Sequence, residues 1–434
     1  MSDAAVLLWD TEIGAVSWVE DRQVAVFQYD PAFVRSGIQL APLMMPLREL
    51  PYEFPALSRE TFKGLPGLLA DSLPDKFGNA VIDTWLASQG RSAASFNSVE
   101  RLAYIGSRGM GGLEFKPAVR ISTARSDEIE VSQLVELSNK ILDERASLGG
   151  VFSGEDDRGA IEDILRVGTS AGGARAKAIL AWNPITNEFR SGQVKIPADF
   201  EYWIMKFDGV SNNRDKEVAD PQGEGKIEYA YHLMAIGAGI EMAECRLHQE
   251  GGRSHFMTKR FDRTADGSKI HMQSLCAISH ITFTEPALFS YEQTIQTMKR
   301  LGLSQTDLEQ QVLRAMFNVV GRNHDDHVKN IAFLMDRRGE WRLSPAFDVS
   351  YSYDPTGYWT SQHQMSLNGK RESFARQDMV SLARLAGIKR NRALEMLDRV
   401  ITSVKTWPEV AVTVGVEEDH IRKIQGVHRL SFLD

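Results

Sequence analysis

Residues 321–330 read GRNHDDHVKN, and residues 345–348 read PAFD. Between them lie two short apolar runs, 331–335 and 341–343, which flank a polar turn and are typical of paired strands. We therefore expect a β-hairpin with a polar loop on one side and an aspartate on the other. Such a hairpin would present both sets of polar side chains to one site.

A helix is expected just before the polar loop. Ser304 and Asp307 have the spacing of a capping box, and apolar residues then recur at helical spacing through Val319. The chain after about residue 285 is mainly helical in pattern, whereas strand-like runs dominate residues 160–265. A strand-rich lobe followed by a helical lobe is the order of a two-lobed kinase.

The loop and the later aspartate have the residue types that phosphoryl transfer needs. Asp325 and Asn330 are separated by four intervening residues, as the base and the metal-binding asparagine are in a kinase catalytic loop. Asp348 would then hold Mg²⁺, which prefers carboxylate and amide oxygens. Asp325 would accept or orient the hydroxyl proton of the acceptor, and His327 and Lys329 could contact phosphate.

Two other interpretations of the HDDH motif at residues 324–327 remain open. It could be a polar loop in which an aspartate caps a helix, or it could hold zinc, although zinc needs three or four ligands at suitable spacing. The hairpin and Asp348 favour the kinase interpretation. The spacing to Asn330 selects Asp325, rather than Asp326, as the base.

A lysine in an apolar strand lies upstream. Residues 202–207 read YWIMKF, and burying the unpaired charge of Lys206 would cost several kcal/mol. We expect an anionic partner, which in kinases is the nucleotide phosphate, although a lysine at a strand end can also reach water. The preceding glycine-rich segment, residues 167–177, could bind phosphate through backbone N–H groups, although an ordinary hairpin loop would look the same.

Composition indicates a globular chain of 434 residues with a net charge of −8 and a pI near 5.8. The acidic balance predicts no general nucleic-acid footprint. Two cysteines argue against a disulfide scaffold, and we expect a cytoplasmic protein without a secretory signal or membrane helix. We predict three parts: 1–150 (a small β-sheet plus helices), 151–265 (a small kinase lobe with the glycine-rich loop) and 266–434 (a helical lobe with the catalytic loop).

These motifs together resemble the HipA-type serine/threonine kinases, the toxins of toxin–antitoxin pairs. The resemblance is carried by FQY at 27–29, LMMPL at 43–47, LPD at 73–75, SAGGARAK at 170–177, RFDR at 260–263, DDHVKN at 325–330 and AFD at 346–348. One departure is QSLC at 273–276, where relatives tend to carry Gln-Glu-Asp. Contacts from that segment are therefore in doubt.

The resemblance implies a role for each site residue. The base would be Asp325, Mg²⁺ would be held by Asn330 and Asp348, and autophosphorylation would fall on Ser170, with Thr169 as the rival position. ATP contacts would come from Ser170, Ala171, Gly172, Gly173, Ala174, Lys206, Lys259, Phe261, His327 and Lys329. A phosphate on the loop would expel it from the nucleotide site by like-charge repulsion, which would inactivate the enzyme.

The resemblance also implies a fold and partners. The fold would be α+β and two-lobed, with a strand-rich N-terminal part and a mainly helical C-terminal part. The partner would be a small, dimeric, HipB-like helix-turn-helix antitoxin, and through it the chain would reach its operator DNA and the nucleoid. The substrate would be an aminoacyl-tRNA synthetase, such as glutamyl-tRNA synthetase. Alternatives are a small-molecule kinase and a non-catalytic co-repressor.

Overall fold

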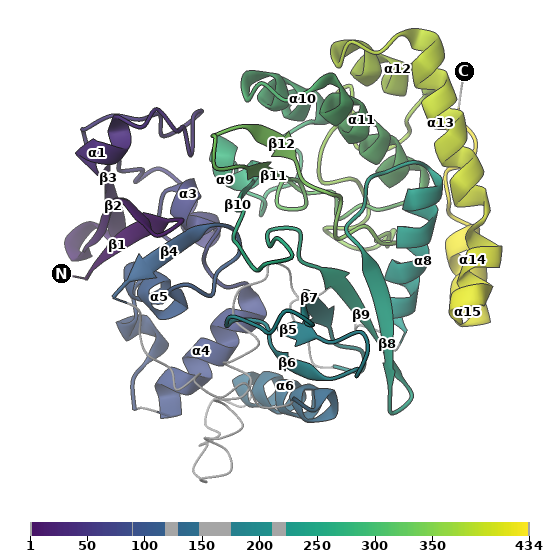
Figure 1. The fold of residues 1–434 in the computed structure, drawn as a ribbon. Coiled ribbons are helices and arrows are strands. Elements are labelled where there is room, and N and C mark those ends of the chain that lie inside the picture. The colour runs from purple at the N-terminus through teal and green to yellow at the C-terminus, as the bar shows by residue number, and fades with distance from the viewer. Residues whose placement is uncertain (1, 89, 118–128, 147–174, 211–222, 433–434) are drawn as a thin grey trace.

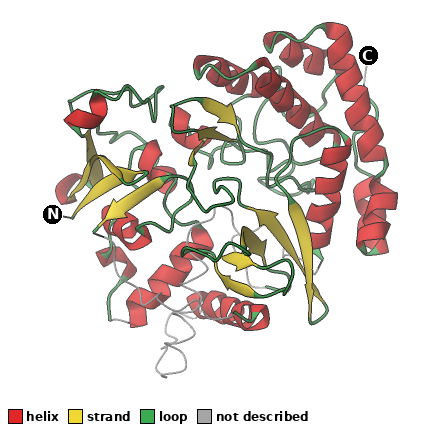
Figure 2. Cartoon of the chain, viewed as in Figure 1, coloured by secondary structure: helices red, strands yellow, loops and turns green. Residues whose placement is uncertain are grey.

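The computed structural model describes residues 2–88, 90–117, 129–146, 175–210 and 223–432 (Figure 1). Three sheets are present in this part of the chain, and helices make up most of the region after residue 275 (Figure 2). The boundary that we predicted between residues 149 and 157 lies outside the described residues. The division into three parts therefore stays a prediction.

The first sheet is antiparallel and has four strands. Their order is β3 (Val24–Tyr29), β2 (Thr11–Val19), β1 (Asp3–Leu8) and β4 (Leu113–Lys116). These strands form the small β-sheet that we predicted within residues 1–150. Helix α5 (Ser98–Ile105) packs against β1 and begins with a capping box between Asn97 and Glu100. Short helices follow the sheet: α1 (Pro31–Val34), α2 (Arg59–Phe62) and α3 (Gly67–Ala70).

The second sheet has five strands and forms the small lobe. Their order is β6 (Phe189–Ser191), β5 (Lys177–Trp182), β7 (Glu201–Lys206), β9 (Arg253–Lys259) and β8 (Cys245–Glu250). Every residue of β5 is buried. Helices α4 (Lys76–Ser88) and α6 (Val131–Ala146) share a hydrophobic core with this sheet, and α8 (Glu224–Gly237) packs on β8 and β9.

The predicted hairpin is confirmed as part of a third sheet. Strands β11 (Ala332–Met335) and β12 (Trp341–Leu343) pair as expected, and β10 (His271–Ser274), which we had not predicted, pairs with β11. The capping box at Ser304 is also confirmed. The helices of this lobe are α9 (Leu275–Ser279), α10 (Tyr291–Arg300), α11 (Gln305–Val320), α12 (Arg376–Leu385), α13 (Arg390–Lys405), α14 (Trp407–Val414) and α15 (Glu418–Gln425).

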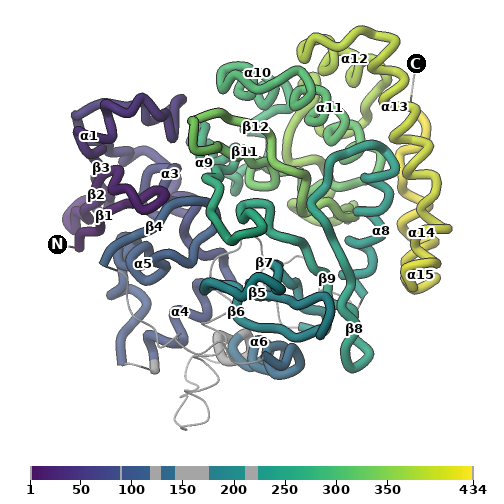
Figure 3. The backbone as a smooth tube through the Cα atoms, viewed as in Figure 1, coloured from purple at the N-terminus to yellow at the C-terminus, as the bar shows by residue number. Residues whose placement is uncertain are grey.

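The first sheet and the helical lobe share one core, whereas α4 and α6 belong to the core of the five-stranded sheet. Residues 1–146 are thus divided between two cores (Figure 3). The predicted α+β architecture, strand-rich at first and mainly helical later, is confirmed. Across the described ranges, no helix is long and apolar enough to cross a bilayer.

The N-terminal region and the helical lobe meet without a gap at Gly67. Its N–H donates to His280 Nε2 at 3.0 Å, and a Cβ at this position would lie 2.2 Å from the carbonyl oxygen of Ala277. Next to it, the Asp71 carboxylate accepts from both the N–H (2.6 Å) and the hydroxyl (2.8 Å) of Ser274. The segment 273–276, where the sequence departs from its relatives, is therefore tied to the N-terminal region.

Gly67→Ala should lower the free energy of unfolding by about 1–3 kcal/mol, since the added methyl group meets backbone rather than a flexible side chain. Urea unfolding monitored by tryptophan fluorescence measures the change. Gly426→Ala is the control, because its Cβ would make ordinary contacts of 3.4 Å. Equal stability of the two variants would contradict this close packing.

Candidate active site

The polar loop and Asp348 lie on either side of the hairpin and face one another. A cavity of about 30 Å³ is lined by residues of both, including His327, Asn330 and Asp348. The amide nitrogen of Asn330 donates to the carbonyl oxygen of Asp325 at 2.9 Å. This bond leaves the amide oxygen of Asn330 for another ligand. Because the cavity exceeds the roughly 10–15 Å³ that one water needs, it can hold an ion or a water.

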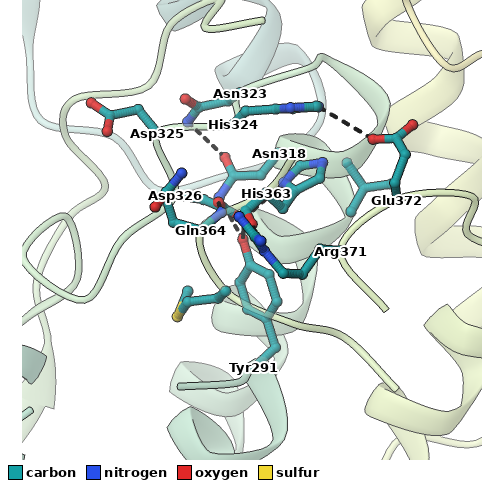
Figure 4. Close-up of polar contacts among 12 residues, drawn as sticks. Tyr291, Asn318, Asn323, His324, Asp325, Asp326, His363, Gln364, Arg371 and Glu372 are labelled. Atoms are coloured by element: carbon teal, nitrogen blue, oxygen red, sulfur yellow. Dashed lines mark hydrogen bonds and ion pairs between the residues drawn. The ribbon is translucent and has the colours of Figure 1, made fainter. Parts of the chain in front are cut away.

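Asp325 is the exposed acid of the loop. Its side chain is 56% exposed, and one carboxylate oxygen lies 3.5 Å from His327 Nε2. Figure 4 shows the carboxylate of Asp325 pointing away from the buried polar groups behind the loop. An acceptor hydroxyl can therefore approach it from solvent.

Asp326 has the opposite environment. Its side chain is 0% exposed and accepts hydrogen bonds from Tyr291 Oη (2.6 Å), His363 Nδ1 (2.8 Å) and the N–H of Gln364 (2.7 Å) (Figure 4). Burial alone would raise the pKa of Asp326, but His363 and these hydrogen bonds hold it below its ordinary value. Asp326 therefore anchors the loop and cannot reach a substrate.

His324 extends this buried network. Its ring lies 4.1 Å from the ring of His363, and its Nδ1 is 2.9 Å from the carbonyl oxygen of Thr360. Burial lowers the pKa of His324 to about 3, so the ring is neutral at physiological pH. Within the described part of the chain, no three histidine, cysteine or acidic side chains gather as metal ligands.

Lys206 is held between two carboxylates. Its Nζ lies 2.5 Å from Glu228 Oε1 and also donates to Asp348 Oδ1. Burial lowers the pKa of Lys206, but the charges of Asp348 and Glu228 outweigh this effect and raise it above its ordinary value. The pKa of Asp348 falls to about 2, because Lys206 opposes the effect of burial. The expected anionic partners of Lys206 are thus protein carboxylates.

Glu228 was not predicted from the sequence, although a signal for it was present. The helix α8 buries Ile227, Tyr231 and Met234 at helical spacing, and Glu228 lies on the same buried side with 3% of its surface exposed. A carboxylate in that position requires a cation. In protein kinases, a glutamate of the small-lobe helix pairs with the strand lysine in this way.

Asp348 adopts a backbone conformation that is rare for its residue type. Its φ is 53°, in the left-handed region. Ala346, two residues before Asp348, forms a β-bridge with Met242. Its N–H also donates to the carbonyl oxygen of Glu241 at 2.8 Å. The chain around Asp348 is therefore held by the small lobe as well as by the hairpin.

The residues expected to contact adenine lie at the end of β9. The N–H of Lys259 donates to the carbonyl oxygen of Glu244, and its Nζ is 2.6 Å from Glu201. Only the carbonyl of Lys259 could therefore meet a base. The ring of Phe261 lies 5.5 Å from that of Phe347, next to Asp348. This contact brings the segment after β9 beside the hairpin.

The remaining predicted site residues are Lys329 and those of the glycine-rich segment. Lys329 Nζ lies 4.9 Å from the centre of the Phe283 ring. Burial raises the pKa of Asp71, and the positive charge of Lys329 opposes part of this effect. A phosphate contact from Lys329 stays a prediction. Thr169, Ser170, Ala171, Gly172, Gly173 and Ala174 lie outside the described residues. Arg175, which follows them, places its Nη1 3.4 Å from Glu228.

Asp326→Asn should destabilise the fold by about 3 kcal/mol, because it removes the buried negative charge that accepts three hydrogen bonds. The native pKa of Asp326 lies below its unfolded value, so its contribution is present above pH ~4 and is lost as the pH falls. Urea unfolding at pH 7 and at about pH 2 measures both effects. Asp325→Asn, one residue away and exposed, should unfold like the wild type. A stable Asp326→Asn variant would contradict the anchoring role.

Two family models match most of the chain. The sequence model of the HipA N-terminal domain matches residues 4–116, and that of the HipA-like C-terminal domain matches residues 169–407. A Sinorhizobium fredii protein that carries a kinase name, Y4mE, is 23% identical over 198 residues, which cover 43% of this chain and 45% of the relative. The chain thus spans less than half the length of that relative.

Solved structures support the fold. The HipA chain from a Shewanella oneidensis complex of HipA, HipB and operator DNA superposes with a TM-score of 0.65 at 17% identity, over 98% of this chain and 95% of that one. The Helicobacter pylori kinase CtkA gives a TM-score of only 0.30 at 14% identity, over 59% of this chain and 86% of that one, too low to compare folds. With both domain models matched and the whole architecture shared, the chain belongs to the HipA family.

Proposed function

We propose that the chain is an ATP- and Mg²⁺-dependent serine/threonine protein kinase that acts as the toxin of a toxin–antitoxin pair. The observation that carries this proposal is the position of Lys206, which contacts both Glu228 and Asp348. A strand lysine, a helix glutamate and a metal-binding aspartate form the same group in protein kinases.

The residues present fit the two cofactors. Asn330 and Asp348 supply an amide oxygen and a carboxylate to the cavity between them, which are the ligands that Mg²⁺ prefers. The bound ion would neutralise charge on the phosphates. Lys206 would bind nucleotide phosphate while it keeps its ion pair with Glu228, since Asp348 is then needed by the ion. The carbonyl of Lys259 and the backbone of Phe261 would contact adenine.

The protein groups then act by position and charge. Asp325 would orient the acceptor hydroxyl and take its proton, and His327, 3.5 Å from Asp325, would lie next to the transferred phosphate. The hydrogen bond from Asn330 to the carbonyl of Asp325 keeps the base and the metal ligand at a constant separation. Asp326 supports the loop from below.

Regulation and partners follow from the family. We propose that Ser170, or Thr169, is autophosphorylated and that the added dianion drives the loop away from the acidic site around Glu228 and Asp348. The Shewanella oneidensis relative was solved with HipB and operator DNA, and a similar helix-turn-helix antitoxin would link this chain, with its net charge of −8, to DNA. The proposed substrate is an aminoacyl-tRNA synthetase. The proposed location is the cytoplasm, at the nucleoid when the antitoxin is bound.

Two alternative functions remain distinguishable by experiment. A small-molecule kinase would use the same residues, but would label a metabolite in preference to any protein. A non-catalytic co-repressor would shift operator DNA with its antitoxin equally well as wild type and as Asp348→Ala. Of these two alternatives, only the non-catalytic co-repressor predicts that no phosphate is transferred from ATP.

Asp325→Asn should lower the rate of phosphate transfer from labelled ATP by about 10²-fold or more, because it removes the proposed base. The assay uses phosphatase-treated protein and measures label on the chain itself. Asp419→Asn, which changes an exposed acid on α15, is the control and should keep full activity. Absence of label on the wild type, or equal labelling of Asp325→Asn, would overturn the kinase proposal.

Glu228→Gln should lower kcat by about 10- to 100-fold with a smaller effect on KM, because Lys206 would lose the group that positions it. Glu228→Asp should restore part of the activity. Glu224→Gln, one turn earlier on α8, is the matched control and should leave kcat unchanged. A proportional loss in all three variants would indicate damage to the helix rather than to the ion pair.

A further inference from the structure

A second cavity, of about 600 Å³, lies apart from the site described above. Its walls come from three segments: the turn between α5 and β4, the connection from β6 to β7, and the chain that follows β9. The lining includes Arg108, Lys195, Arg260, Arg263 and Lys269, against the carboxylates of Glu114 and Asp266. This surplus of cations stands out in a chain with a net charge of −8.

The turn between α5 and β4 is tied to the chain after β9 by three hydrogen bonds, so these two walls are fixed relative to each other. The N–H of Gly111 donates to Asp262 Oδ2 at 2.7 Å, and Arg263 Nη2 donates to the carbonyl oxygen of Gly109 at 3.0 Å. Lys269 Nζ donates to the carbonyl oxygen of Ser107 at 2.6 Å. The cavity is therefore bordered both by the N-terminal region and by the chain that leaves the five-stranded sheet after β9.

Three of the cations already have carboxylate partners. Arg260 and Arg263 share the buried carboxylate of Asp262, both at distances under 3 Å. Lys269 pairs with Glu114 at 2.8 Å. Two guanidinium groups on one carboxylate leave a positive charge in excess at the cavity wall.

Arg108 differs from these three. Only 8% of its surface is exposed, and its hydrogen bond goes to the neutral carbonyl oxygen of Tyr104. Across the described residues, its buried Nε has no hydrogen-bond partner, nor does the buried hydroxyl of Tyr104. A buried guanidinium without a carboxylate costs several kcal/mol unless an anion compensates it. Arg108 and Tyr104 are both among the residues that line the cavity.

The pKa values of two of these cations also favour a bound anion. Burial and the charge of Arg263 lower the pKa of Lys269 to about 8, and burial lowers the pKa of Arg108. Cations that suppress one another's protonation are stabilised when an anion binds between them. The volume is that of a site for a compound of mononucleotide size.

We propose that this cavity binds a small phosphorylated anion, whose phosphate is held by Arg108 and the neighbouring cations. Arginine suits phosphate because its planar fork of donors matches two phosphate oxygens. Exposed Lys195 at the edge would add charge to the entrance. A bound ligand would contact all three segments and would link the N-terminal region to the small lobe.

Inorganic pyrophosphate without magnesium or ATP is the probe, so that binding does not depend on the proposed kinase activity. Isothermal titration calorimetry of the full chain should show binding that weakens with salt. Arg108→Gln should raise the Kd about tenfold or more, since it removes a buried charge-assisted contact. Arg108→Lys should restore part of the affinity.

Lys195→Gln should raise the Kd severalfold, and its control is Lys389→Gln, an equally exposed lysine on the opposite lobe. Asp348→Ala should bind like the wild type, because the nucleotide site is not involved. If Arg108→Gln fails to fold, the comparison of Lys195→Gln with Lys389→Gln decides. No binding by the wild type, or equal binding by the cavity variants and their control, would overturn the proposal.

Discussion

The site depends on one buried positive charge. Lys206 extends from a central strand of the small lobe and meets Glu228 from helix α8 and Asp348 from the far side of the hairpin. Because removal of Lys206 would take the shared cation away from two carboxylates, the ion pairs fix the relative positions of strand, helix and hairpin. These ion pairs position Asp348, and thereby one wall of the cavity next to it.

The adjacent residues Asp325 and Asp326 have different environments in the polar loop, the first exposed and the second buried. Asp326 is enclosed by Tyr291, His363 and Gln364, and these contacts determine the direction of the chain at residue 325. Asp325 therefore projects outward, with His327 Nε2 3.5 Å from its carboxylate. An exposed acid held by a buried neighbour can approach a substrate while its position remains defined.

The N-terminal region does not stand apart from the rest. Its sheet shares a core with the helical lobe, whereas its later helices α4 and α6 pack on the five-stranded sheet. Asp71 holds Ser274, and Lys177 pairs with Asp75 at 3.2 Å in a buried contact. A region in contact with both lobes limits how far they can move relative to each other.

The sequence by itself determined the local structure and the chemical types. The capping box at Ser304, the hairpin at 331–343 and the separation of Asp325 from Asn330 depend on residues close together in the chain, and periodicity and spacing report such features. Lys206 was also predicted to need an anion, because a charge in an apolar strand is costly.

Only the tertiary structure decided which groups satisfy these needs. Glu228 and Asp348 are 22 and 142 residues from Lys206 along the chain, and nothing in local spacing connects them. The pairing of β10 with β11, the burial of Asp326 beside exposed Asp325, and the cations around Arg108 likewise arise from segments far apart in sequence. Packing between distant segments determines which side chain pairs with a buried charge such as Lys206, whereas the local sequence pattern shows only that the charge needs a partner.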